Sequence, residues 1–155
     1  MSTTVFTDLV TPVVASWLND VNTSAYNGPA GYLWTGNGLS NLGSWKPPLI
    51  LQNSQSAAYQ LVATDAGKHI LHPSADTTAR VWTIPANATV PFDVGTAITF
   101  VNQNAAGVIT IAITSDTMRL AGPGTTGSRT LAANGIATAL KITATEWIIS
   151  GTGLV

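Results

Sequence analysis

The feature that most constrains this fold is a succession of short β-strand patterns, which begins near residue 57 and recurs about every ten residues. Each pattern is bounded by Gly, Asn, Asp or Pro, the residue types that turns favour. In residues 108–114, β-branched residues alternate with small ones, which is the two-residue period of a half-buried strand. Many short strands joined by turns indicate a mainly β domain, a β-sandwich or jelly roll, and not a βαβ fold.

We expect this β domain to span residues 47–155, because Pro47-Pro48 marks an entry point and Leu49-Ile50-Leu51 follows it. The predicted strands cover residues 59–63, 69–72, 80–84, 97–102, 108–114, 118–120, 129–131, 136–143 and 147–150. Asn134-Gly135 is a turn signal that separates two of these strands. Trp82 and Trp147 lie on predicted strands and are expected in the core.

Residues 1–46 have a different pattern and are predicted to form an extended N-terminal arm with one short helix over about residues 13–26. In that segment Val14, Trp17, Leu18 and Val21 recur at steps of three and four, the spacing of one helical face. Asn27-Gly28-Pro29 is a helix stop. The apolar face either packs within the chain or contacts another molecule.

Residues 30–48 are rich in Gly and aromatic residues, with Tyr32, Trp34 and Trp45 spaced by glycines. The segment has too few periodic apolar positions for a helix or strand of any length. Its aromatic side chains carry a large apolar area that favours burial. They are expected to cover a surface, either on their own domain or on another chain.

Charged residues make up only 8% of the sequence, against roughly 25% in an ordinary soluble protein. Because the cores of protein interfaces are depleted of charge, this composition favours an assembly protein, the alternative being an unusually neutral monomer. The net charge is −1 and no basic stripe is present, so nucleic acid is not an expected partner. The sequence has no cysteine, no secretory signal and no apolar run of membrane-spanning length, so we expect a soluble chain without a membrane partner.

The sequence offers no strong catalytic or metal-binding pattern. His69 and His72 are three residues apart on a predicted strand, so they should point to opposite faces and could not easily share one ion. No serine lies in a Gly-x-Ser-x-Gly elbow, and the seven carboxylates are spread singly, although two could still meet in space as in a glycosidase. We therefore predict a protein without enzymatic activity, cofactor or metal, an enzyme acting on the cell envelope being the less favoured alternative.

Two parts of the chain resemble structural proteins of tailed bacteriophages. The segment Val13-Val14-Ala15-x-Trp17-Leu18-Asn19-Asp20-Val21-Asn22 resembles the N-terminal anchor of phage fibres and tailspikes. The main domain is similar to a module of phage virion proteins in these stretches: Tyr59-x-Leu61, Asp65-Ala66-Gly67-Lys68, Thr83-Ile84-Pro85-Ala86-Asn87, Val94-Gly95-Thr96, Gly107-x-Ile109-Thr110-Ile111 and Glu146-Trp147-Ile148-Ile149-Ser150-Gly151.

This resemblance implies a virion structural protein that is assembled in the host cytoplasm. Fibres and spikes continue into a long shaft or receptor-binding domain, whereas this sequence ends at Val155, and its size is similar to that of capsid decoration (cement) proteins. We expect a homotrimer that binds the major capsid protein or another virion protein; the alternative is a short tail-fibre or adaptor subunit involved in host adsorption. The expected partner-binding residues of the arm are Phe6, Trp17, Leu18, Val21, Trp34 and Trp45.

Overall fold

The computed structural model describes residues 33–35, 44–46 and 49–155. The chain divides into two units, Met1–Leu49 and Ile50–Val155. The predicted boundary between residues 46 and 47 lies three residues before this division. Each unit is described by itself.

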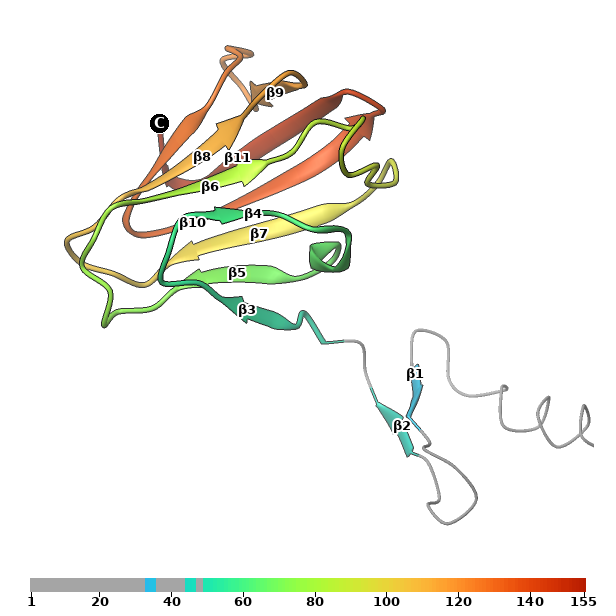
Figure 1. Ribbon diagram of the computed structural model, residues 1–155, viewed down its shortest axis with the longest axis horizontal. Coiled ribbons are helices and arrows are strands. Elements are labelled where there is room, and N and C mark those ends of the chain that lie inside the picture. The colour runs from blue at the N-terminus through green and yellow to red at the C-terminus, as the bar shows by residue number, and fades with distance from the viewer. Residues whose placement is uncertain (1–32, 36–43, 47–48) are drawn as a thin grey trace, which may run out of the picture. The chain divides into compact units, whose positions relative to one another are not determined.

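The described part of the first unit is a short antiparallel ladder (Figure 1). Strand β1 (Leu33–Thr35) pairs with β2 (Ser44–Lys46), and the register sets Trp34 opposite Trp45. The Gly-rich segment thus contains two three-residue strands that its sequence did not predict. The predicted helix over residues 13–26 lies outside the described residues, as do Phe6, Trp17, Leu18 and Val21.

The second unit is built almost entirely of strands (Figure 1). These are β3 (Gln52–Ser54), β4 (Tyr59–Gln60), β5 (His69–His72), β6 (Arg80–Ile84), β7 (Ala97–Asn102), β8 (Ile109–Ile113), β9 (Thr117–Leu120), β10 (Arg129–Thr143) and β11 (Glu146–Leu154), with a 3-10 turn at Ala63–Asp65. The predicted bounds of β5, β6 and β7 agree with the observed ones. The prediction of a mainly β chain is confirmed; its finer part, an arm followed by a sandwich or jelly roll, stays a prediction.

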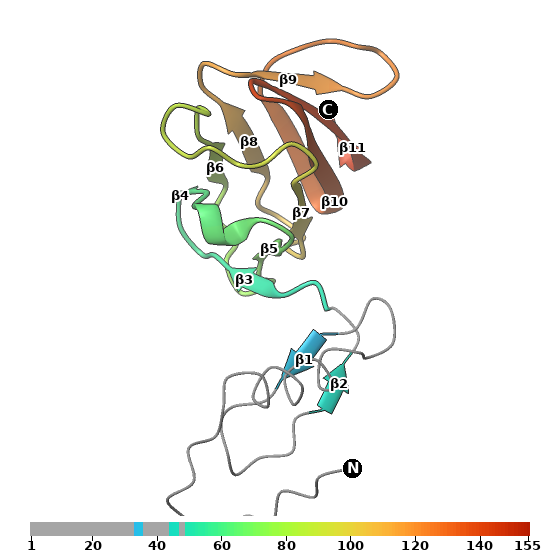
Figure 2. The same cartoon turned by 90° about the vertical axis from the view of Figure 1, so that its right-hand side faces the viewer.

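The chain winds back and forth between two rows of parallel strands. β3, β5 and β7 form one row, and β4, β6 and β8 form the other. Parallel neighbours need a crossover connection, and here each crossover contains a strand of the opposite row. The second unit is therefore a coil of strand pairs, β3 with β4, β5 with β6 and β7 with β8, in which the sheet curls to bring the rows face to face (Figure 2).

The long strand β10 joins the two rows. Its first residues pair with β8 and its later residues, from Ile136 to Leu140, pair with β7, while β11 runs along its other edge. The register shifts between Leu131 and Ile136, where Asn134 has a φ of 56°. A β-bulge of this kind bends a strand and increases its twist. The prediction that Asn134-Gly135 ends one strand and starts another was wrong: the signal marks a bend within a single strand.

The predicted strand over residues 59–63 was also too long. β4 ends at Gln60, and the chain then forms the turn Ala63–Asp65. The Asp65 carboxylate accepts a hydrogen bond from the backbone N–H of Val62 at 2.9 Å, which favours a capped turn over a continued strand. Asp65 also accepts hydrogen bonds from Asn53 of β3 and the Tyr59 hydroxyl of β4, so it connects the first pair of strands to this turn.

The core lies between the two rows. Trp82 of β6 faces Phe100 of β7 and His72 of β5, with ring centroids 6.2 Å and 6.0 Å apart. Trp82 and Trp147, both predicted core residues, are fully buried. The other buried apolar residues are Leu61, Ile70, Ile84, Phe92, Ile98, Phe100, Ile109, Ile111, Met118, Leu131, Ala137, Ala139 and Ile149.

Replacing Trp82 by alanine should destabilise the second unit by about 3–5 kcal/mol, because it removes the largest side chain between the rows and leaves a cavity. Val81, its neighbour on β6, is 46% exposed on the other side of the strand and supplies a matched control. Val81→Ala should change stability by less than about 1 kcal/mol. Urea denaturation measures both values; equal losses would show that the core is not centred on Trp82.

Candidate interaction face

The side of the sheet that faces away from the core has a regular arrangement of residues. Alternate residues of a strand point to opposite faces, so the pairing register aligns the outward residues of neighbouring strands in rows. One row contains Ser54, Leu71, Val101, Ile136 and Thr152, and the next contains Gln52, His69, Thr99, Thr138 and Ser150. We call these ten residues the outer face.

The outer face contains no Lys, Arg, Asp or Glu. Its polar groups are five hydroxyls, one amide and one histidine, and some pair with each other: Thr99 Oγ1 lies 3.0 Å from Thr138 Oγ1, and His69 Nε2 lies 3.1 Å from Gln52 Oε1. Ile136 is 49% exposed in the middle of this surface. The face is thus uncharged and partly aliphatic.

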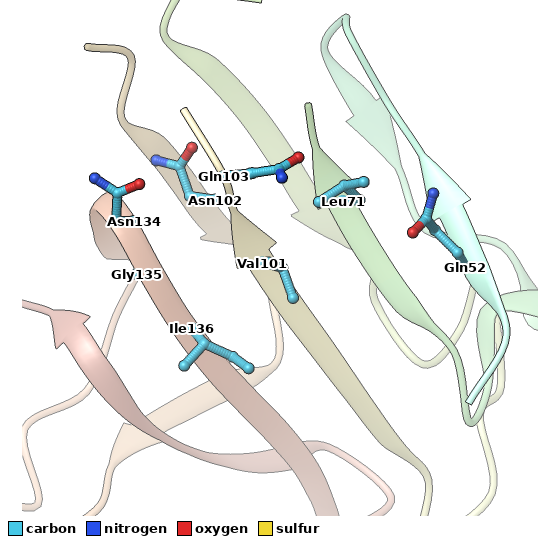
Figure 3. A pocket seen from close by; sticks show the side chains of 8 residues that line it. All are labelled: Gln52, Leu71, Val101, Asn102, Gln103, Asn134, Gly135 and Ile136. Carbon is cyan, nitrogen blue, oxygen red and sulfur yellow. The ribbon is translucent and has the colours of Figure 1, made fainter. Parts of the chain in front are cut away.

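A shallow pocket of about 440 Å³ lies on this face beside the bulge of β10 (Figure 3). Val101 lies between Leu71 and Ile136 there, and together they form an aliphatic wall. The remaining lining residues, mostly amides, are Gln52, Asn102, Gln103, Asn134 and Gly135. Gly135 is needed at the bend, since a Cβ there would lie 2.8 Å from the Ala132 carbonyl oxygen.

A buried hydrogen-bond network holds the strand ends beneath the pocket. The Asn102 amide nitrogen donates to the carbonyls of Gly107 and Ala132 at 2.8 Å and 3.1 Å. This fixes the orientation of the amide, so its oxygen faces His72 Nδ1, 2.9 Å away. Fully paired buried polar groups of this kind specify one arrangement of the chain. The network therefore connects β5, β7 and β10 behind the outer face.

The network continues to Asp76, in the connection between β5 and β6. Its carboxylate accepts hydrogen bonds from Arg80 Nε at 2.8 Å and from the Thr78 N–H at 3.1 Å, and it lies 3.0 Å from His72 Nε2. The Arg80 guanidinium is the main cause that holds the pKa of Asp76 well below its ordinary value, with further help from Thr78 and His72. Arg80 and Asp76 thereby close this end of the coil.

A histidine beside an aspartate resembles part of a catalytic triad, but the geometry favours a structural role. Both ring nitrogens of His72 already meet partners, Asn102 on one side and Asp76 on the other. A general base needs a free nitrogen within hydrogen-bond reach of a nucleophile. His72 is also fully buried. His69 points to the outer face, as the alternation of the strand predicted.

The structure brings two of the predicted partner-binding residues together, Trp34 and Trp45, which are opposed in the β1–β2 register.

The outer face, by contrast, was missed by the sequence reasoning. A signal for it exists in residues 136–140, where the large residues Ile136 and Leu140 alternate with the small, buried Ala137 and Ala139. Large apolar residues on the outward side of a strand, with alanines on the inward side, indicate a surface that contacts another molecule.

The chain matches no protein-family profile, no curated protein and no solved structure. Within residues 33–35, 44–46 and 49–155, no cluster of three or more His, Cys, Asp or Glu side chains has the arrangement of a metal site. In the same residues, no helix has the length and apolar character needed to cross a membrane.

The low pKa of Asp76 predicts acid sensitivity. A carboxylate whose pKa is lowered by folding stabilises the protein above its unfolded pKa, and that contribution is lost as the pH falls toward the folded value. The urea midpoint of the wild type should therefore drop below about pH 4 more steeply than that of Asp76→Asn. Asp93→Asn, at an exposed turn position, is the control and should keep the wild-type slope. Parallel curves for the wild type and Asp76→Asn would contradict the prediction.

Proposed function

We propose that this protein is a non-enzymatic structural component of a tailed-phage particle: a capsid decoration protein that forms a homotrimer and binds the major capsid protein or another virion protein. The observation that carries this proposal is the uncharged outer face, which spans β3, β5, β7, β10 and β11. In the proposed assembly, the outer face supplies the contact between copies and residues 1–46 supply attachment to the particle.

The chemistry of the outer face supports contact with another protein surface. Burying an ionised group without a partner costs several kcal/mol, and the ten residues of the face carry no permanent charge. Their hydroxyls and the Gln52 amide can each donate and accept hydrogen bonds, so they can pair with either kind of group on a neighbour. Exposed aliphatic side chains such as Ile136 add apolar area to such a contact.

The finer fold assignment is part of the proposal. Two rows that face each other across Trp82 and Phe100 support a description of the second unit as a sandwich or jelly-roll-like domain. An arm with a helix over residues 13–26 would add apolar anchors to a neighbouring subunit without a large folded interface. Its anchors are Phe6, Trp17, Leu18, Val21, Trp34 and Trp45, because large aromatic residues tend to dominate interface energies.

The pocket on the outer face favours a second candidate, a short tail-fibre or adaptor subunit involved in host adsorption. Its amide groups, among them Gln52, Gln103 and Asn134, are suited to bind the hydroxyl groups of a glycan. Aliphatic Leu71, Val101 and Ile136 would contact the apolar face of a sugar ring. Binding of the intact protein to host-surface glycans, and not to capsid shells, would favour this candidate.

A charge placed on the outer face should weaken self-association. Ile136→Lys would set three like charges against one another in a trimer and lower the association constant at least about tenfold, because like charges at an interface repel. Val94→Lys, at a turn position that is 63% exposed, is the matched control. Light scattering over a range of concentrations measures the oligomer. A wild-type monomer with a concentration-independent thermal midpoint would contradict the trimer.

Removal of residues 1–46 should leave a folded β domain that no longer binds particles. The second unit contains the described apolar core, so it should unfold cooperatively after the deletion. Co-sedimentation with particles measures binding, and full-length Trp17→Ala, compared with Asn19→Ala on the other side of the predicted helix, tests the anchor alone. Retained binding by the shortened chain would assign attachment to the β domain.

A further inference from the structure

Lys141 is buried in the interior of the second unit, which is an unusual position for a lysine. It lies near the end of β10, points inward and is only 1% exposed. Its Nζ lies 5.5 Å from the centre of the Trp147 ring and 2.5 Å from Oδ1 of Asn87. Within the described residues, no carboxylate oxygen lies within 4.0 Å of this nitrogen. A buried ammonium is therefore set against a carboxamide, without a counter-ion.

The backbone holds both residues in place. The Lys141 N–H donates to the Thr96 carbonyl at 2.9 Å, and the Lys141 carbonyl accepts from Gly95 at 2.8 Å. The Asn87 N–H donates to Oδ2 of Asp116 at 2.9 Å. Lys141 thus comes from β10 and Asn87 from the connection between β6 and β7, two segments far apart in the sequence.

We propose that Lys141 and Asn87 form an intramolecular isopeptide bond after the chain has folded. The lysine Nζ first loses one proton, which frees its lone pair to attack Cγ of the asparagine side chain. A new C–N bond forms, Nζ loses a second proton, and the bond from Cγ to Nδ2 breaks. The departing nitrogen takes up the protons released by Nζ and leaves as ammonium. One ammonium and one primary amide are thereby converted into one secondary amide and free ammonium, so the reaction needs no oxidant or other reactant.

The hydrogen bond brings Nζ close to the carbon that it would attack. A C=O bond is about 1.2 Å long, so Nζ lies no farther than about 3.7 Å from Cγ. Reactions between held groups become fast when the reacting atoms are about 3–3.5 Å apart and aligned. Lys141 is only 1% exposed and its Nζ lies over the Trp147 ring, which Phe92 contacts edge-on with centroids 5.7 Å apart, so water that would compete as a nucleophile has little access to the amine.

The burial of Lys141 also favours the product. Before the reaction, a positive charge is held inside the protein with an aromatic face and one amide oxygen as its compensating contacts. Afterwards the interior contains a neutral amide, and the charge has moved into water as ammonium. Because burying an unpaired charge is costly, the folded protein drives the conversion.

Intact-mass spectrometry of the purified wild-type protein tests the proposal. We expect a mass about 17 Da below that of the unmodified chain, the mass of one ammonia. Trypsin does not cleave after an acylated lysine, so the digest should contain residues 81–119 joined to residues 130–155. An unmodified mass, with a free peptide that ends at Lys141, would overturn the proposal.

The controls separate this bond from other losses of ammonia. Lys141→Met and Asn87→Ala should both restore the unmodified mass, whereas Lys68→Met, at a half-buried lysine outside the site, should retain the loss. Asn-Gly pairs such as Asn134-Gly135 can also lose ammonia by forming a succinimide, but they cannot join two tryptic peptides. A loss located at such a pair, with residues 81–119 free, would likewise overturn the proposal. Because the wild type itself gives the deciding result, a variant that fails to fold does not prevent the test.

Discussion

The second unit depends on one constraint, the double pairing of β10. This strand is hydrogen-bonded to β8 near its start and to β7 farther along, so it fixes the two rows relative to each other. The bulge between Leu131 and Ile136 redirects the strand from one row to the other. Without it, the winding chain would have two separate rows of parallel strands and no element that holds them face to face around Trp82.

The outer face follows from the same constraint. Between Ile136 and Leu140, where β7, β10 and β11 run side by side, the inward positions of β10 are Ala137 and Ala139, and the larger Phe100, Ile98 and Ile149 beside them fill the interior. The small inward side chains of β10 leave room for bulky core residues on the neighbouring strands. Ala137, for example, lies opposite Phe100. The aliphatic residues of β10 are then left on the outward side, next to threonines. An uncharged surface of this kind suits contact with protein better than contact with nucleic acid or ionic ligands.

The sequence predicted those parts of the fold that local pattern determines. The bounds of β5, β6 and β7 could be read from alternation and flanking turn residues alone. β3 was missed because Gln52-Asn53-Ser54 has no apolar residue, and its strand geometry comes from pairing with β5. Asn134-Gly135 was misread because a left-handed residue serves a turn and a bulge equally well; only the partner strands decide between them. The outer face needs the register of distant strands, which no local pattern contains.

A coil of two strand rows leaves its interior open where the strands end, and polar side chains close both ends here. At one end, His72 and Asp76 tie the connection between β5 and β6 to the core. At the other, Lys141 reaches Asn87 in the connection between β6 and β7. The first closure includes the ion pair of Asp76 with Arg80, and acid weakens this pair because Asp76 can be protonated. Among residues 49–155 the second has no carboxylate partner, and an amide there would join strand and loop independently of pH. At acidic pH the covalent closure would therefore persist where the ion pair fails.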